Sequence, residues 1–221
     1  MIFQDETSAL AAEAALSIAM AEMAPPGVAL ACRLIRPGDE NRLLPEESRS
    51  ISARQPAARR ASGAARSAAR TLFSSRGITG AVIPRAASGE PLWPAGFSGS
   101  LAHDEQMAVA ALAAGIAAIG IDVEPAEPLP PEIAAVVRTP GDVTGGIDPT
   151  LADRLLFSAK EAVYKASFPL DRQILGYEHI AVDLANAKGV TSLGRRARLS
   201  WCLAPRIVVL AICEADARAD R

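Results

Sequence analysis

The longest uncharged apolar run in the chain, residues 107–121, most restricts the folds open to it. The run is shorter than the roughly 20 residues that a membrane-spanning helix needs, and glycines interrupt it. A short apolar run bounded by turn signals is typical of buried strands. We therefore expect two buried strands that meet at a turn near Gly115, in a protein that is soluble and cytoplasmic.

The composition agrees with a folded cytoplasmic protein of one large or two small domains. Hydrophobic residues make up 50% of the 221 residues and charged residues 22%, which excludes a disordered chain. The formal net charge of −2 argues against a general nucleic-acid-binding protein. The three cysteines form no CxxC pair, which favours a reducing compartment. The first ten residues, MIFQDETSAL, lack the basic start and apolar core of a signal peptide.

Three alanine-rich or capped segments predict helices and several apolar segments predict strands. The predicted helices cover residues 5–23, 54–73 and 150–168, and the last is expected to end at Phe168 and Pro169. Strands are expected over residues 28–35, 179–184, 197–203 and 206–213. Two stretches rich in proline and glycine, 84–99 and 125–148, are expected to be loops, the second of them mobile.

Two carboxylates stand two residues apart in the sequence Gly120-Ile-Asp-Val-Glu124. Successive side chains of a strand alternate between faces, so Asp122 and Glu124 point the same way. Such a pair is half of a site for a hard divalent cation. Alone, however, a D-x-E sequence is better explained as a strand end that meets solvent.

A third carboxylate, Glu161, lies between Lys160 and Lys165 on the predicted helix 150–168. Glu161 and Lys165 are four residues apart, so an ordinary helix ion pair explains them as well as a functional site does. The cluster nevertheless lies beside Phe157 and Tyr164, at the edge of an apolar face. Three carboxylates with neighbouring lysines indicate magnesium-dependent chemistry on a phosphorylated substrate.

The predicted helix 54–73 carries arginines, of which Arg59, Arg66 and Arg70 share one face. A solvated helix face is the favoured interpretation, and a phosphate-binding face is the alternative. His103 follows Gly99 and Ser100 at a place where backbone N–H groups and hydroxyls can meet an anion. The sequence contains no Walker loop, GxGxxG, GxSxG or HExxH motif, so several common enzyme classes lose their signatures.

Taken in order, four segments resemble the 4′-phosphopantetheinyl transferases of the large, surfactin/enterobactin type. They are Gly89-Glu-Pro-Leu-Trp-Pro94, Gly99-Ser-Leu-Ala-His103, Gly120-Ile-Asp-Val-Glu124 and the stretch 157–166. The Trp-Pro and Ser-x-x-His segments are most similar to the branch of enterobactin synthetase component D. The resemblance covers the chain from about residue 44 to its C-terminal end.

The resemblance implies a pseudo-twofold α/β (α+β) fold with two similar halves, expected at residues 1–115 and 116–221. It implies that coenzyme A binds in the cleft between the halves. Its phosphopantetheine arm would be transferred to a serine of an acyl or peptidyl carrier protein, and adenosine 3′,5′-bisphosphate would leave. The resemblance also implies a cytoplasmic monomer that depends on Mg²⁺ or Mn²⁺.

The resemblance assigns roles to ten residues. The metal ligands of the family match Asp122, Glu124 and Glu161. Its catalytic residues match Asp122, Glu161 and Lys165. Glu161, or a water that it holds, would accept the serine proton. The positions that match coenzyme A contacts are Arg59, Arg66, Arg85, Ser100, His103, Lys160 and Lys165. Arg60 competes with Arg59 for the first phosphate contact. Asp104 departs from the family pattern and is expected to face outward.

Two rival functions use the same residues. A magnesium-dependent phosphoesterase or nucleotide hydrolase would keep the three carboxylates and need no carrier protein. A non-catalytic module would bind coenzyme A or a carrier protein with a degenerate site, although Asp122, Glu124, Glu161 and Lys165 are all intact. For the transferase, the connector 125–148 is expected to form part of the surface that meets the acidic carrier protein.

Overall fold

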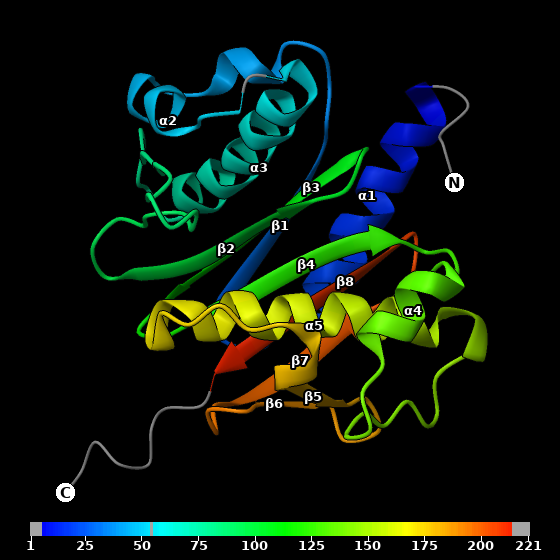
Figure 1. The fold of residues 1–221 in the computed structure, drawn as a ribbon. Coiled ribbons are helices and arrows are strands. Elements are labelled where there is room, and N and C mark those ends of the chain that lie inside the picture. The colour runs from blue at the N-terminus through cyan, green and yellow to red at the C-terminus, as the bar shows by residue number, and fades with distance from the viewer. Residues whose placement is uncertain (1–5, 54, 214–221) are drawn as a thin grey trace, which may run out of the picture.

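The computed structural model describes residues 6–53 and 55–213, which form two antiparallel sheets, each carrying a long helix (Figure 1). Residues 5 and 54, the expected first residues of two helices, lie outside the described part. Within the described residues, no helix combines the length and the apolar character needed to span a membrane.

The first sheet has three strands in the order β1-β3-β2, and the helix α3 packs on it. Its strands are β1 (Val28–Leu34), β2 (Phe97–His103) and β3 (Met107–Ala114). The helical segments of this part of the chain are α1 (Glu6–Met23), η1 (Asp39–Arg42), α2 (Pro45–Ser50) and α3 (Pro56–Ser74). The expected helices 5–23 and 54–73 and the expected strand 28–35 are therefore confirmed.

The second sheet has five strands in the order β4-β8-β7-β6-β5, and the helix α5 lies along β4 (Figure 1). Its strands are β4 (Ile119–Pro125), β5 (Ile180–Asp183), β6 (Lys188–Thr191), β7 (Arg196–Cys202) and β8 (Arg206–Cys213). The helical segments are α4 (Pro131–Val137), α5 (Pro149–Asp171) and η2 (Tyr177–His179). The two antiparallel sheets and the helices packed on them confirm the mixed α/β (α+β) class that the sequence predicts.

The apolar run is continuous because β3 is buried on both faces. Val109 and Ala111 point into a core shared with α1 and with the second sheet. Ala110 and Leu112 point the other way, into the core beneath α3. The run does form two strands that meet near Gly115, whose φ of 72° suits a glycine. The two strands belong to different sheets, so this turn is the crossing point between them.

The second sheet meets α5 at unusually short range through Gly120. A Cβ atom on Gly120 would lie 2.0 Å from the carbonyl oxygen of Ala162, so only glycine lets β4 approach the helix this closely. Ile121 and Val123 point to the opposite face, into the core under α1. Gly120, Asp122 and Glu124 therefore share the face that meets α5.

The structure corrects three expectations. The segment before Ser100 is not entirely a loop, because β2 begins at Phe97 and pairs with β3 despite its glycine and serines. Helix α5 does not end at Phe168 but continues to Asp171 with Pro169 inside it. Proline removes only one N–H donor, and the N–H of Arg172 still closes the last turn on the carbonyl of Phe168. The connector is partly ordered, because it contains α4 and bonds to β5 through Val143.

Candidate active site

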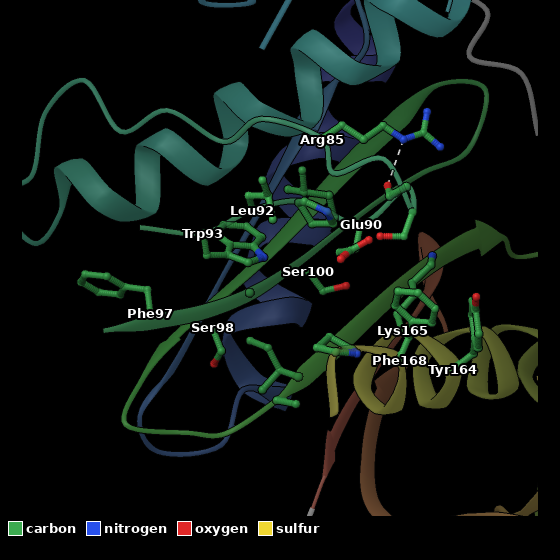
Figure 2. A pocket seen from close by; sticks show the side chains of 18 of the residues that line it. Arg85, Glu90, Leu92, Trp93, Phe97, Ser98, Ser100, Tyr164, Lys165 and Phe168 are labelled. Carbon is green, nitrogen blue, oxygen red and sulfur yellow. Dashed lines mark hydrogen bonds between the residues drawn. The ribbon is translucent and has the colours of Figure 1, made fainter. Parts of the chain in front are cut away.

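A cavity of about 510 Å³ opens between the two sheets, next to α5. Figure 2 shows Arg85, Glu90 and Trp93 on the wall from the first part of the chain, and Lys165 and Phe168 on the wall from α5. The floor comes from β2 and from residues 117–119, just after the crossing point. The cavity is therefore built by both parts of the chain, as the expected cleft requires.

The first wall is a hairpin-like loop, residues 85–93, which internal hydrogen bonds hold in shape. Arg85 and Pro91 form an isolated bridge, and the Arg85 side chain donates from Nε to the carbonyl of Gly89 at 2.9 Å (Figure 2). Trp93 packs against the core beneath α3, and its indole covers Gly99, where a Cβ would lie 2.5 Å from the ring. Trp93 thus anchors this loop in apolar surface.

Asp122 and Glu124 both reach across to α5, as their shared face on β4 requires. Lys165 Nζ donates to Asp122 Oδ1 at 2.6 Å and to the carbonyl of Ile121 at 3.3 Å. Arg154 Nη1 donates to Glu124 Oε2 at 2.7 Å. Burial, followed by the charge of Asp122, raises the pKa of Glu124 to about 7 despite Arg154. Asp122 thus lies close enough to Glu124 to disfavour the ionisation of Glu124.

Glu161 belongs to the same electrostatic group. Burial raises the pKa of Glu161, and the charge of Asp122 adds to that rise, whereas Lys165 opposes it. The hydroxyl of Tyr177 donates to Glu161 Oε1 at 3.1 Å. The three carboxylates that the sequence singles out are therefore brought to one region, where the charge of Asp122 acts on both Glu124 and Glu161.

These carboxylates fit a divalent cation in their chemistry but are not assembled as its ligands. Among residues 6–53 and 55–213, no three histidine, cysteine, aspartate or glutamate side chains are arranged to hold a metal ion. Asp122 Oδ2, however, is buried and has no hydrogen-bond partner among the described residues. A buried carboxylate oxygen without a donor is costly unless a cation meets it. Carboxylate oxygens are donors that suit Mg²⁺. The metal role of Asp122, Glu124 and Glu161 therefore stays a prediction, and the chemistry of these side chains fits it.

The expected coenzyme A contacts divide into those that line the cavity and those that do not. Arg85, Ser100 and Lys165 line it. His103 lies further along β2 with an exposed ring, near the carbonyl of its neighbour Asp104. Arg59 is not among the described lining residues, because its guanidinium donates to the carbonyl of Ile51 and the hydroxyl of Ser48.

Arg66 is also committed to the protein interior. Its side chain is buried, and Nε donates to the carbonyl of Ile83 at 2.7 Å. Burial lowers the pKa of Arg66 to about 10, and the nearby carboxylate of Glu47 opposes that change. The predicted phosphate contact by Arg66 is not supported by this geometry, which uses the arginine to hold the chain just before Arg85.

Lys160 is not among the described residues that line the cavity. Its side chain is completely buried, and Nζ lies within 3.1 Å of oxygens from Val137, Thr139, Asp142 and Tyr177. An ammonium has three N–H groups, all of which these oxygens satisfy. The expected contact of Lys160 with coenzyme A therefore finds no support, because the side chain faces the connector and not the cavity.

The structure also shows residues that the sequence patterns did not single out. Arg154 pairs with Glu124 and also donates to the carbonyls of Glu127 and Pro128, so it holds the end of β4. Tyr177 comes from the short helix η2, far from the motifs in sequence. A helical spacing of seven from Glu161 could have marked Arg154 as sharing its face. Nothing in the sequence pointed to Tyr177.

The expectation that Asp104 faces outward is wrong. Its side chain is folded into the β2–β3 turn, where Oδ1 accepts from the N–H groups of Gln106 and Met107 at 2.7 Å. Oδ2 lies 3.2 Å from Nε of the buried Arg206 on β8. A turn that needs acceptors for two backbone donors draws an aspartate inward. Asp104 thus links the turn after His103 to the second sheet.

Two family models match adjacent parts of the chain. The model of the 4′-phosphopantetheinyl transferase N-terminal domain matches residues 46–113, and that of the 4′-phosphopantetheinyl transferase superfamily matches residues 118–213. The boundary between the two matches falls at the crossing point between the sheets.

Three curated relatives carry the same description. The 4′-phosphopantetheinyl transferase PptT of Mycobacterium tuberculosis is 36% identical over 148 residues, which are 63% of this chain and 65% of that protein. The 4′-phosphopantetheinyl transferase Svp of Streptomyces mobaraensis is 34% identical over 64% of this chain and 61% of its own length. For the 4′-phosphopantetheinyl transferase Npt of Nocardia iowensis the identity is 36%, over 59% of this chain and 62% of its own. The chain thus spans less than two thirds of each relative.

Together, the two family models match the whole chain except residues 1–45, 114–117 and 214–221. Both models describe one family, and the three relatives bear its name. The order of the motifs, the two-sheet fold and the cleft between the sheets agree with these matches. The chain therefore belongs to the 4′-phosphopantetheinyl transferase superfamily.

Proposed function

We propose that this protein transfers the 4′-phosphopantetheine arm of coenzyme A to a serine hydroxyl of an acyl or peptidyl carrier protein. The observation that carries the proposal is the position of Lys165, which lines the cavity between the two sheets while its ammonium bonds to Asp122. One side chain thus connects a cavity large enough for a cofactor to the group of three carboxylates. Family membership and the three relatives support the same reaction.

The reaction needs little beyond positioning and charge. The serine oxygen forms a bond to the phosphorus that bears the pantetheine arm, and the bond from that phosphorus to the bridging oxygen breaks. Adenosine 3′,5′-bisphosphate leaves with the electron pair. Lys165 and Arg85, both at the cavity, would bind and orient the phosphates, and Ser100 would donate a hydrogen bond to them.

Glu161 is the proposed acceptor of the serine proton, directly or through a water that it holds. Its raised pKa suits a base that must take up a proton near neutral pH. The hydroxyl of Tyr177 donates to Oε1 of Glu161, so Oε2 of Glu161 is the oxygen that would accept the proton. Asp122, Glu124 and Glu161 would hold a divalent cation, Mg²⁺ or Mn²⁺, which when bound supplies positive charge to the pyrophosphate.

Finer features of the proposal rest on the sequence. The Trp-Pro and Ser-x-x-His segments favour the branch of enterobactin synthetase component D. The proposal also includes a domain boundary between residues 115 and 116, a monomeric state and a cytoplasmic location. The proposed pathway makes a siderophore or another secondary metabolite. The names of the relatives identify the enzyme family and do not specify any of these.

The proposed carrier surface is the exposed face of α4 in the connector. Ile133 and Val136 are exposed there, the second by 66%, and Arg138 follows with 52% of its side chain exposed. Apolar side chains beside an arginine suit an acidic helical partner. Val136→Asp should raise the KM for the carrier and leave coenzyme A binding unchanged. Ile18→Asp, at an equally exposed position on α1, is the control, and an unchanged carrier KM for Val136→Asp would refute this surface.

The decisive experiment is the intact mass of apo carrier proteins after incubation with this protein, coenzyme A and Mg²⁺. A gain of one phosphopantetheine arm, lost with Asp122→Asn and kept with Glu178→Gln, would establish the transfer. Glu178 is a suitable control because 70% of its side chain is exposed. Breakdown of coenzyme A without carrier modification would favour the hydrolase. Binding of coenzyme A with neither reaction would favour the non-catalytic module.

A further inference from the structure

We propose that Lys160 is a positioning residue that holds Tyr177 against Glu161 and fixes the connector beside α5. The inference rests on the proposed transferase function, because it assigns Lys160 a part in preparing Glu161. It departs from the role that the motif resemblance suggests, in which Lys160 contacts coenzyme A. The contacts of the ammonium group carry the proposal.

The Lys160 ammonium lies at the centre of a buried polar group, which we call the Lys160 hub. The hub consists of Lys160, Val137, Thr139, Asp142 and Tyr177. Nζ donates to the carbonyl of Val137 at 2.8 Å, to the hydroxyl of Thr139 at 3.1 Å and to the carbonyl of Tyr177 at 3.1 Å. It also lies 2.8 Å from Asp142 Oδ2, and neither side chain of that pair is exposed by more than 4%.

Asp142 extends the Lys160 hub into the second sheet. Its Oδ2 accepts from both the N–H and the hydroxyl of Thr139, which closes a tight turn at the end of α4. Its Oδ1 accepts from the N–H of Val182 on β5 at 2.9 Å. One lysine therefore ties α5 to the connector, to β5 and to η2. A buried cation whose donors are all paired is a structural element and has none left for a ligand.

Tyr177 connects the hub to the candidate active site. Its carbonyl accepts from Lys160, and its hydroxyl donates to Glu161 Oε1 at 3.1 Å. Its ring packs against that of Phe157, with ring centroids 5.8 Å apart. Lys160 and Glu161, which are consecutive residues of α5, thus bond to the carbonyl and to the hydroxyl of the same tyrosine. Loss of the Lys160 contact would release η2 and remove a donor from Glu161.

The two lysines of α5 have opposite environments, which makes the proposal testable. Lys165 lines the cavity with 28% of its side chain exposed, whereas Lys160 is fully buried. They are five residues apart, so they point in different directions from the helix, while Glu161 and Lys165 share a face. A ligand that enters the cavity meets Lys165 and cannot reach the Lys160 ammonium.

The test compares Lys160→Met, Tyr177→Phe and Lys165→Met with the wild-type protein and with Lys188→Met, an exposed lysine on β6. Two quantities are measured: amide hydrogen exchange over residues 137–142 and 177–179, and kcat and KM for coenzyme A with an apo carrier protein. We expect Lys160→Met to accelerate exchange in both segments. Both Lys160→Met and Tyr177→Phe should lower kcat by roughly tenfold or more with little change in coenzyme A KM. Lys165→Met should raise that KM.

Tyr177→Phe keeps the experiment informative if Lys160→Met does not fold, because it removes only one hydroxyl. An unchanged kcat for Tyr177→Phe would overturn the link from the hub to Glu161. If Lys160→Met instead raised the coenzyme A KM as Lys165→Met does, without faster exchange, Lys160 would be a ligand-binding residue and the proposal would fail. A wild-type protein that transfers nothing would refute the proposed function, while the exchange data would still test the hub.

Discussion

Helices α3 and α5 are both long, and each packs on one antiparallel sheet, yet among the described residues only α5 of the two places a basic side chain in the cavity wall. On α3 the arginines bond to nearby parts of the protein: Arg59 to α2 and its end, Arg60 to Glu40, Arg70 to Glu47. On α5, Lys165 lines the cavity and bonds to Asp122 across the gap to β4. None of the α3 arginines is among the described residues that line the cavity.

The difference arises from what surrounds each helix. The segment 35–51 wraps around α3 and presents carbonyls and carboxylates to it, so a row of arginines finds acceptors within the protein. Beside α5, Gly120 lets β4 come close and brings two carboxylates with it. The regular spacing of cations on a helix therefore predicts that they share a face, but the neighbouring segments decide whether that face is structural or functional.

The largest expected effect is on the α3 side. Glu47 is fully buried and accepts from Arg70 and from the N–H groups of Leu44 and Ile83. Glu47→Ala should lower the free energy of unfolding by about 3–5 kcal/mol, because it leaves a largely buried guanidinium and two amides without their acceptor. Urea denaturation measures this loss. Glu46→Ala is the matched control, since Glu46 is 54% exposed. A loss as small as that of the control would show that α3 is not held through Glu47.

Two glycine substitutions test the different roles of α3 and α5 more directly. A Cβ on Gly63 of α3 would lie 1.9 Å from the carbonyl of Asp39, and one on Gly120 would lie 2.0 Å from that of Ala162. Each change to alanine should therefore cost about 3 kcal/mol of stability. Only Gly120→Ala should also lower kcat for the folded enzyme, because it pushes α5 away from Asp122.

The control for this pair is Gly145→Ala, where a Cβ would meet open space. Urea denaturation and turnover with an apo carrier protein are the measurements. Equal loss of kcat in Gly63→Ala and Gly120→Ala would contradict the division of roles between α3 and α5.

The pH dependence of stability should reveal the carboxylates beside α5. The folded pKa of Glu124 is raised to about 7, above its ordinary value. The folded state therefore binds the proton more tightly, and stability falls as the pH rises from the unfolded pKa through 7. Relative to Glu124→Gln, the wild-type protein should lose about 2 kcal/mol between pH 5 and pH 8.

Thermal or urea unfolding of both proteins at the two pH values provides the measurement. The comparison with Glu124→Gln cancels the titration of other groups. Added Mg²⁺ should reduce the loss at pH 8 if the carboxylates hold the cation. A difference that stays constant with pH would mean that neither burial nor Asp122 raises the pKa of Glu124 in the folded protein.

The smallest expected effect is that of Arg59→Gln. The substitution removes hydrogen bonds to Ile51 and Ser48 and should lower the free energy of unfolding by about 1 kcal/mol. The KM for coenzyme A should not change, because Arg59 bonds within the protein. Steady-state kinetics and urea denaturation measure the two quantities side by side. A clear rise in KM would show that Arg59 leaves these partners to bind phosphate, and the contrast between α3 and α5 would weaken.

Much of the fold follows from local sequence. Alanine-rich composition, capping residues and apolar runs predict α1, α3, α5, most strands and the Gly115 turn between β3 and β4. The motifs also identify Asp122, Glu124, Glu161 and Lys165, which the structure brings together. The strand β2 and the helix α4 were missed, because glycine, serine and proline hide elements that pairing with neighbours stabilises.

The roles of individual charged residues could not be read in this way. Lys160 and Lys165 have the same side chain and stand in one motif, yet one is buried among carbonyls and the other lines the cavity. Arg66 and Asp104 are likewise directed by partners far away in sequence, Ile83 and Arg206. Tyr177 reaches Glu161 only because η2 packs beside α5.

Local sequence is enough to predict most of the helices and strands, the side chains that share a face, and the carboxylates that can act together. These depend on backbone periodicity, a local property of the chain. The direction and the partners of each charged side chain depend on the tertiary fold, since the partners of Lys160, Arg66 and Lys165 come from other segments. A buried charge must find oppositely charged or hydrogen-bonding partners, and folding alone brings those partners within reach.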